Sequence, residues 1–179
     1  MLPTIATPRL RLRWLTAADV PALFAVFGDA EACRYLSRPP LRDLAGAAQL
    51  LAEIEGCFAA GSLLQWGMAL LETDEVIGTF TLAAITHEHR RAEVGYAIAR
   101  AYWGRGYIGE ALPAMVSHAF GALDLHRLEA DVDPRNGASI RALERIGFRL
   151  EGHLRERYHV NGEAQDALLY GLLRREWAG

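Results

Sequence analysis

A glycine-rich stretch from Trp103 to Gly109, WGRGYIG, has residue types and spacing that could bind an anionic ligand. The stretch lies between a predicted strand and a predicted helix. Small residues there let backbone N–H groups approach an anion, and the helix N-terminus adds unpaired donors and a partial positive charge. Arg105 adds a full positive charge in the same turn. The combination suits a pyrophosphate, although such a turn often does no more than redirect the chain.

The same segment argues against two other phosphate-binding motifs. A P-loop needs a lysine, which the segment lacks. Gly104, Gly106 and Gly109 match the letters of the dinucleotide motif GxGxxG, but that motif follows the first strand of a βαβ unit. Four strands and two helices are predicted before this loop, so the order of elements argues against NAD.

Several titratable side chains lie where they could move a proton. Glu93 lies on a predicted strand, and His87 and His89 lie in the loop before it. A carboxylate whose pKa is raised by burial, or a histidine, can act as a general base. Each also has an ordinary interpretation, as a solvated strand-face glutamate or as exposed loop histidines. Nothing selects among the three tyrosines that could protonate a leaving group, Tyr107, Tyr158 and Tyr170.

Hydrophobic periodicity predicts the elements that position these residues. Seven strands are expected, at 9–15, 63–71, 76–86, 92–99, 128–132 and on either side of the turn dipeptide Asn161-Gly162. Four helices are expected, at 16–28, at 41–61, from the end of the glycine-rich stretch 103–109 through 119, and at 136–147. In the first strand Arg9, Arg11 and Arg13 are expected to face water. The order β-α-α-β-β-β-α-β-α-β-β fits one mixed sheet with helices on both faces, in a single domain over 1–179.

Composition narrows the function classes. The formal net charge of −3 makes a large nucleic-acid footprint unexpected. Cys33 and Cys57 are predicted to be reduced thiols, and no cysteine or histidine cluster predicts a metal site. The first residues carry arginines where a signal peptide is apolar, and no apolar run is long enough to span a membrane. A cytoplasmic protein without a bound metal is expected.

Three segments together give the chain a family resemblance. They are YWGRGYIGEAL at 102–112, EADVDPRNGASIRALERIGFRLEG at 129–152 and HVNGEAQDALLYGLLRREW at 159–177. In this order and spacing, the chain resembles GNAT acetyltransferases of the RimJ/RimL-like branch, the ribosomal-protein N-terminal acetyltransferase type. The resemblance spans nearly the whole chain. It implies an α+β fold with a single mixed, mostly antiparallel sheet of about seven strands and helices on both faces.

The resemblance also implies acetyl-CoA as co-substrate. The loop would bind its pyrophosphate through backbone N–H groups, although Trp103 and Ile108 depart from the family pattern. Pantetheine would insert between the strands at 92–99 and 128–132, where a bulge at Gly95 could supply an oxyanion hole. The residues expected to contact the cofactor are Tyr96, Ile98, Trp103, Gly104, Arg105, Gly106, Tyr107, Ile108, Gly109, Asn136 and Ser139.

Catalytic roles follow from the same resemblance. Glu93 is the expected general base, because an alkyl amine is almost wholly protonated at neutral pH and must lose a proton before it attacks. Asn136 would bind the pantetheine arm and Ser139 would stabilise or protonate the leaving thiolate. Both residues are equally good helix caps. The expected reaction is direct transfer of the acetyl group to a primary amine, without a covalent enzyme intermediate.

The acceptor is open at this stage. The first hypothesis is the α-amino group of a protein or peptide N-terminus, and polyamines, amino acids and aminoglycosides are the alternatives. The segments 37–61 and 86–91 are expected to line the acceptor side. A non-catalytic acyl-CoA sensor is the rival from another class, and it would bind acetyl-CoA without releasing thiol. A monomer or homodimer is expected, with no membrane or nucleic-acid partner.

Overall fold

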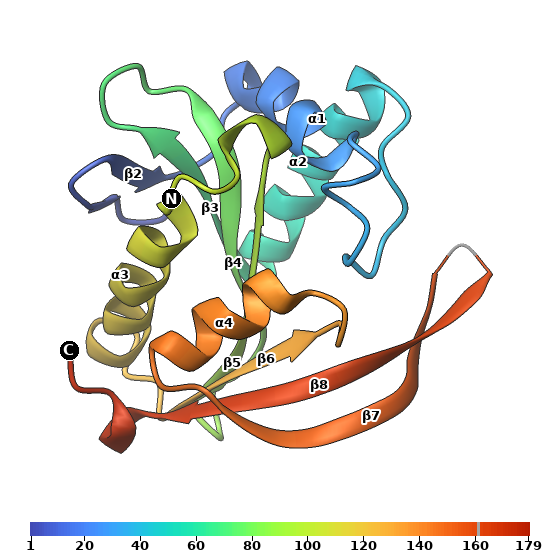
Figure 1. The fold of residues 1–179 in the computed structure, drawn as a ribbon. Coiled ribbons are helices and arrows are strands. Elements are labelled where there is room, and N and C mark those ends of the chain that lie inside the picture. The colour runs from blue at the N-terminus through green and yellow to red at the C-terminus, as the bar shows by residue number, and fades with distance from the viewer. Residues whose placement is uncertain (161) are drawn as a thin grey trace.

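The computed structural model describes residues 1–160 and 162–179 and contains one eight-stranded sheet (Figure 1). The strands are β1 (Ile5–Ala6), β2 (Leu10–Arg13), β3 (Leu63–Leu70), β4 (Val76–Thr86), β5 (Arg91–Ile98), β6 (Arg127–Val132), β7 (Arg149–Val160) and β8 (Glu163–Leu173). The helices are α1 (Val20–Phe27), α2 (Leu44–Ala59), α3 (Tyr107–Gly121) and α4 (Gly137–Arg145). The seven expected strands and four expected helices are confirmed, and the two-residue β1 is an addition too short to show periodicity.

The sheet has the order β1-β2-β3-β4-β5-β6-β8-β7. Every neighbouring pair is antiparallel except β5 and β6, which are parallel. The first five strands form a meander in chain order. The last strand, β8, is inserted between β6 and β7. The expected α+β fold with a mostly antiparallel sheet is therefore confirmed.

Helices cover both faces of the sheet and enclose two cores (Figure 1). Alternate residues of β3 divide between them: Trp66 and Met68 pack in the core with α3 and α4, and Ala69 packs in the core with α1 and α2. Trp66 is fully buried, and its indole N–H donates to the Pro3 carbonyl at 3.0 Å. This alternation follows from the two-residue period of a strand.

Local signals fix most helix ends. Thr16 and Asp19 form the expected capping box, which opens a short 3-10 turn (Ala17–Asp19) before α1. The second helix begins at Leu44 rather than at Leu41, because Asp43 caps it by accepting a hydrogen bond from the Gly46 N–H at 2.8 Å. In the described residues no helix has the length and hydropathy of a membrane-spanning segment.

The structure adds detail to two expectations, one about Arg13 in β2 and one about the β7–β8 hairpin. Arg13 does not simply face water: it donates to Asp19 at 2.9 Å and to Asp74 at 3.0 Å, with its side chain 16% exposed. The predicted hairpin of β7 and β8 is present, with Val160 opposite Glu163. Of the expected turn dipeptide, Gly162 has a φ of 83°, whereas Asn161 lies outside the described residues.

Candidate active site

The parallel strands β5 and β6 are joined over only three residue pairs. Arg91, Ala92 and Glu93 pair with Arg127, Leu128 and Glu129, and no described pairing continues beyond Glu93. The rest of β5 stays in register with β4, and β6 stays paired with β8. The two strands thus diverge into a gap whose walls are strand edges, and backbone N–H and C=O groups alternate along such edges. An extended ligand could pair with them as an added strand does.

The glycine-rich loop closes the wide end of this gap. Gly104 and Gly106 have φ angles of 73° and 79°, in the left-handed region that favours glycine. Gly106 is the N-cap residue of α3, and the helix begins at Tyr107. The N–H groups of the first helical turn have no acceptor within the helix and are therefore available to an anion. The local geometry suits the predicted pyrophosphate site.

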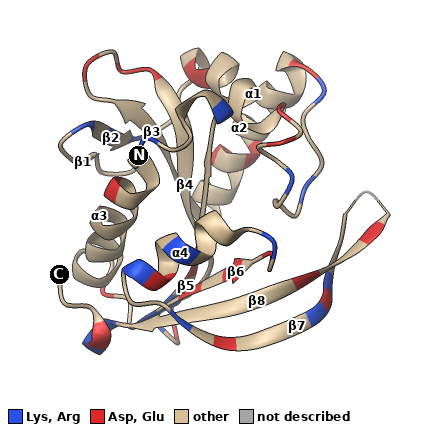
Figure 2. Cartoon of the chain, viewed as in Figure 1, with Lys and Arg blue, Asp and Glu red and all other residues tan. Residues whose placement is uncertain are grey.

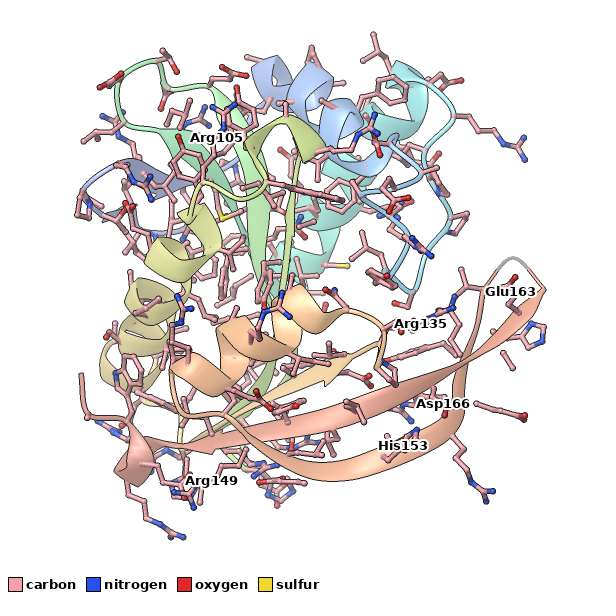
Figure 3. All side chains as sticks on the ribbon, in the orientation of Figure 1. Arg105, Arg135, Arg149, His153, Glu163 and Asp166 are labelled. Atoms are coloured by element: carbon pink, nitrogen blue, oxygen red, sulfur yellow. The ribbon has the colours of Figure 1, made fainter. Side chains whose placement is uncertain are left out.

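A cavity of about 340 Å³ runs from this loop into the gap. Its lining includes ten of the eleven residues expected to contact the cofactor: Tyr96, Ile98, Trp103, Gly104, Gly106, Tyr107, Ile108, Gly109, Asn136 and Ser139. Arg105 belongs to the loop that follows β5 but is not in the lining (Figure 3). Its guanidinium lies 5.4 Å from the centre of the Tyr102 ring.

The two departures from the family loop pattern have local explanations. The Trp103 indole N–H donates to the Ile98 carbonyl at 2.8 Å, which ties the loop to the end of β5. Ile108 turns inward and packs against the core, while a side chain at Gly109 would meet open space. Ile108 thus packs partly against the core and also lines the cavity.

A clasp from the N-terminal segment holds the loop and α3 in place. Glu110, in the first turn of α3, accepts hydrogen bonds from the Thr7 hydroxyl, the Arg9 N–H at 2.7 Å and the Arg9 guanidinium at 2.6 Å. Arg9 also donates to the Arg105 carbonyl at 3.0 Å. Burial alone would raise the pKa of Glu110, but these bonds from Thr7 and Arg9 outweigh it and lower that pKa.

Asn136 and Ser139 lie where both of the roles expected for them are sterically possible. The Asn136 side-chain oxygen caps α4 by accepting from the Ser139 N–H at 3.2 Å, and both residues line the cofactor cavity. The Tyr96 hydroxyl lies 3.5 Å from the Ser139 carbonyl, across the gap. The cap therefore fixes where both polar side chains enter the gap, so cap and ligand roles do not compete.

The expected bulge at Gly95 is wrong. β5 keeps an unbroken register with β4 from Glu93 to Ile98, with Gly95 opposite Thr81. The irregularity lies instead in β4, between Ala83 and Thr86, where Ala84 has a φ of 47°. A Cβ on Gly95 would make only an ordinary contact of 3.9 Å with Thr81. Glycine often marks a bulge, but here the bulge falls on an alanine in the partner strand.

A second, smaller cavity of about 180 Å³ continues on the other side of Tyr96. It shares Tyr35, Leu36, Tyr96, Asn136 and Ser139 with the first cavity, so the two form one groove. Glu93 lines this second cavity. Burial raises the pKa of Glu93, and the carboxylates of Asp131 and Glu129 raise it further. A general base near the acceptor would gain from such a shift.

Asp131 and Tyr158 face Glu93 from the opposite strands. The Tyr158 hydroxyl donates to Asp131 Oδ2 at 2.8 Å, and both residues line the second cavity. Burial and Asp131 raise the pKa of Tyr158 to about 12. Sequence reasoning named Tyr158 without selecting it and missed Asp131. The available signal was the alternation Glu129, Asp131 on one face of a strand predicted to border the gap.

Other expected residues lie away from the groove. His87 and His89 are exposed in the turn before β5, at the joined end of the strand pair, and line neither cavity. The Tyr170 hydroxyl donates to Glu144 at 3.0 Å, also outside both cavities. Of the segments 37–61 and 86–91, only Ser37 is in the acceptor-side lining. The segment 86–91 ends at Arg91, at the joined end of the β5–β6 pair, so it is separated from the gap.

Comparisons with known proteins find related N-acetyltransferases. Residues 9–149 match the family model described as the acetyltransferase (GNAT) domain. An uncharacterized N-acetyltransferase of Bacillus licheniformis, p20, is 35% identical over 178 residues, or 99% of this chain and 100% of that protein. The spermidine N(1)-acetyltransferase of Escherichia coli K12 is 33% identical over 94 residues, or 52% of this chain and 50% of that protein.

A solved structure has the same architecture. RimJ of Mycobacterium smegmatis, in complex with CoA-disulfide, aligns with a TM-score of 0.87 at 25% identity. The alignment covers 99% of this chain and 90% of that chain.

Proposed function

The chain belongs to the GNAT acetyltransferase family, and from that premise we propose that it transfers acetyl from acetyl-CoA to the α-amino group of a protein or peptide N-terminus. The observation that carries the proposal is the continuous groove. Its wide end meets the helix N-terminus and glycine loop, and its other end contains Glu93. Acetyl donor and amine acceptor would therefore enter from opposite ends and meet near Tyr96 and Ser139.

The donor end fits a CoA thioester. Backbone N–H groups of the loop and of the first turn of α3 would bind the pyrophosphate, and the edges of β5 and β6 would bind the pantetheine amides. The CoA-disulfide in the RimJ structure supports a ligand of this class. When bound, acetyl-CoA supplies the acetyl thioester.

The residues at the junction would manage the protons. Glu93 would accept a proton from the ammonium, directly or through water, which leaves a neutral amine able to attack the carbonyl carbon. Ser139 would donate a hydrogen bond or proton toward the departing sulfur. Tyr96, whose hydroxyl lies 3.5 Å from the Ser139 carbonyl, would hold the junction closed to bulk water.

Two features support a peptide acceptor. The acceptor cavity is small, about 180 Å³, and shares Asp166 with a wider groove of about 780 Å³ along β7. In that groove the register between β7 and β8 shifts between Leu154 and Tyr158, so the ladder is interrupted there. The first residue of a peptide would occupy the small cavity, and its following residues would pair with free backbone groups of the groove.

A small-molecule amine is the second candidate, and the relative that carries the name spermidine N(1)-acetyltransferase favours it. That likeness covers about half of each protein, so it carries less weight for the acceptor than a likeness over the whole chain would. The carboxylate side chains in the acceptor cavity, Glu93, Asp131, Asp133 and Asp166, also suit a cationic small molecule.

The test is release of CoA thiol from acetyl-CoA by the pure protein in the presence of separate pools of amines. The pools are short peptides with free N-termini, polyamines, amino acids and aminoglycosides, with N-terminally blocked peptides as the matched control. We expect release with free peptides and none with blocked ones. Release with polyamines alone would replace the peptide proposal by the second candidate. Thermal stabilisation by acetyl-CoA without release from any pool would contradict both.

A further inference from the structure

The polar face of β5 and β6 carries a balanced ion-pair network where the strands are joined. Arg91 pairs with Glu129 at 2.7 Å, and Arg127 pairs with Glu129 at 2.8 Å and with Glu151. These are two guanidinium groups and two carboxylates, and each charge has a partner of opposite sign. Both guanidinium groups of the network are therefore already paired, and neither forms an ion pair with the described residues that follow along β5 and β6.

Glu93 and Asp131 are the carboxylates beyond this network, where the strands separate. Glu93 is the register partner of Glu129, and Asp131, two residues further along β6, shares the face of Glu129. The cation nearest to Asp131 is Arg157, with its Nε at 3.5 Å and its side chain 52% exposed. Within residues 1–160 and 162–179, Glu93 has no ion pair. One partly solvated guanidinium thus faces two carboxylates.

Asp131 has an oxygen free for a ligand. Its side chain is only 6% exposed, and the contacts from Tyr158 and Arg157 both go to Oδ2. Oδ1 has no hydrogen-bond partner among the residues that the structure describes, and Asp131 lines the acceptor cavity. A carboxylate enclosed to this degree is stabilised by a donor, and most strongly by a cationic one. An ammonium group in the cavity would supply both the hydrogen bond and the missing charge.

We propose that Asp131 is the specificity-determining residue of the acceptor cavity: it binds the acceptor as an ammonium ion and disfavours amines that carry a carboxylate beside the nitrogen. The inference deepens the proposed function and rests on it for the identity of the reaction. Tyr158 positions the carboxylate by bonding Oδ2. The substrate class is a primary amine whose neighbouring carboxyl is absent or blocked, as in an amide or a peptide, and not a free amino acid.

The fate of the proton follows from the two carboxylates. The ammonium binds Oδ1 of Asp131, one of its N–H bonds breaks, and the proton is transferred to Glu93. The neutral nitrogen, still held in the cavity, is then free to attack. Asp131 takes no proton in this step and acts only in positioning and selection.

Alaninamide and alanine form the test pair, because they differ chiefly in the carboxylate. Binding of each is measured by calorimetry to protein saturated with CoA, and kcat/KM for each is measured by thiol release from acetyl-CoA. We expect wild-type protein to prefer alaninamide in both assays. Asp131→Asn should weaken alaninamide binding by about tenfold or more. The same variant should reduce the preference for the amide and leave the KM for acetyl-CoA unchanged. The ratio of the alaninamide value to the alanine value is compared between wild-type protein and Asp131→Asn. The difference between the amine pKa values of the two compounds is the same for both proteins and therefore cancels.

Two further variants keep the test sharp. Glu144→Gln is the matched control, since Glu144 also accepts a hydrogen bond from a tyrosine, Tyr170, but lies outside both cavities. It should leave the preference unchanged. Arg157→Gln alters an exposed side chain and should raise the affinity for alaninamide, because it removes the cation that competes for Asp131. If Asp131→Asn does not fold, Arg157→Gln still tests whether Asp131 binds the acceptor.

The outcomes separate the two proposals. An unchanged amide preference in Asp131→Asn, or weaker alaninamide binding in Arg157→Gln, would overturn the role of Asp131 even if the wild-type protein acetylates amines. The expected binding pattern without thiol release by wild-type protein would support the role of Asp131 and refute the proposed function. Failure of wild-type protein to bind alaninamide would overturn the inference.

Discussion

At the scale of single residues, Glu93 carries the sharpest expectation about pH. Its pKa is raised by burial and by Asp131 and Glu129, while Arg157 and Arg91 oppose the shift. A base acts in its ionised form, so the rate should fall as pH decreases through this raised pKa. In kcat at saturating substrates, the acidic limb should therefore lie above the ordinary glutamate value of about 4.3.

Glu93→Gln tests this role directly. We expect transfer to slow by on the order of a hundredfold, with acetyl-CoA affinity retained and the acidic limb lost. Thiol-release rates across a pH series provide the measurement. Glu88→Gln, an exposed glutamate in the turn before β5, is the control and should behave as wild type. Wild-type rates and an unchanged limb in Glu93→Gln would remove Glu93 from the mechanism.

Gly106 carries the prediction for the cofactor end. Gly106→Asp should abolish acetyl-CoA binding in calorimetry, because it adds negative charge at the helix N-terminus and strains a residue with a φ of 79°. Gly61→Asp is matched for backbone strain, with a φ of 71° and open space around it, but lies at the end of α2. It should bind acetyl-CoA normally. Equal affinities in the two variants would refute the loop assignment.

At the scale of elements, the clasp between the N-terminal segment and α3 should make stability depend on pH. The lowered pKa of Glu110 means that its contribution is fully present above the pKa of the unfolded chain and is lost as pH falls through the folded value. Glu110→Gln should lower the free energy of unfolding by about 1–3 kcal/mol at neutral pH. Urea unfolding at neutral and acidic pH measures both effects.

The matched control for the clasp is Glu72→Gln, an exposed glutamate in the turn between β3 and β4. Its unfolding free energy should stay close to wild type at both pH values. If Glu110→Gln were equally silent, the contacts with Thr7 and Arg9 would contribute nothing measurable to stability.

The sequence predicted elements well where a local signal exists. The capping pair of Thr16 and Asp19, the alternation in the first strand and the glycine loop before α3 each specify their structure through neighbours in the chain. The apolar pattern predicts that α2 starts at Leu41, three residues before its actual start, because the pattern does not include the cap at Asp43. The bulge was assigned to Gly95 rather than to β4 near Ala84, since an alanine with positive φ has no sequence signature.

The sequence predicted most of the candidate site on the donor side, but on the acceptor side it selected only Glu93 and left Tyr158 as one of three candidate tyrosines. The loop and the first turn of α3, which are expected to contact the cofactor, follow one another in the chain, so the glycine pattern and the family resemblance both point to them. The acceptor cavity combines β5, β6, β7 and β8, and the relevant partners, Asp131 and Tyr158, are 27 residues apart. No period or motif relates such positions. Their contact depends on the insertion of β8 into the sheet, which is a tertiary event.

At the scale of the whole molecule, the sheet has two halves, β1 to β5 and β6 to β8, which meet where β5 lies beside β6 (Figure 1). Only three residue pairs join them. Acetyl-CoA bound in the gap would pair with both free edges and join the halves. We expect hydrogen exchange to slow at Val94–Ile98 and at Ala130–Val132 when acetyl-CoA is added. At a ligand concentration of about 100 Kd the whole protein should gain about 2.7 kcal/mol of stability. Slower exchange in the loop alone would contradict binding within the gap.

Charge is also arranged at this scale. Figure 2 shows both signs interspersed along β7, and Figure 3 shows Asp166 and His153 together on the β7–β8 hairpin. His153 lies 2.7 Å from Asp166, which also accepts a hydrogen bond from the Glu156 N–H at 2.9 Å. These contacts fix the interrupted stretch of β7 that borders the proposed peptide groove.

The strand order has a consequence for the protein as it is synthesised. In β1 to β5 each strand pairs with the one made just before it, so this half can assemble while translation continues. In the other half β6 can pair with β5, but β6 and β7 are not neighbours, and the sheet between them is completed only when β8 enters. The wall that holds Asp131 and Tyr158 therefore closes only after Leu173 has left the ribosome. A nascent chain would have one face of its binding groove in place well before the other, and premature termination within β8 would leave that groove permanently half built.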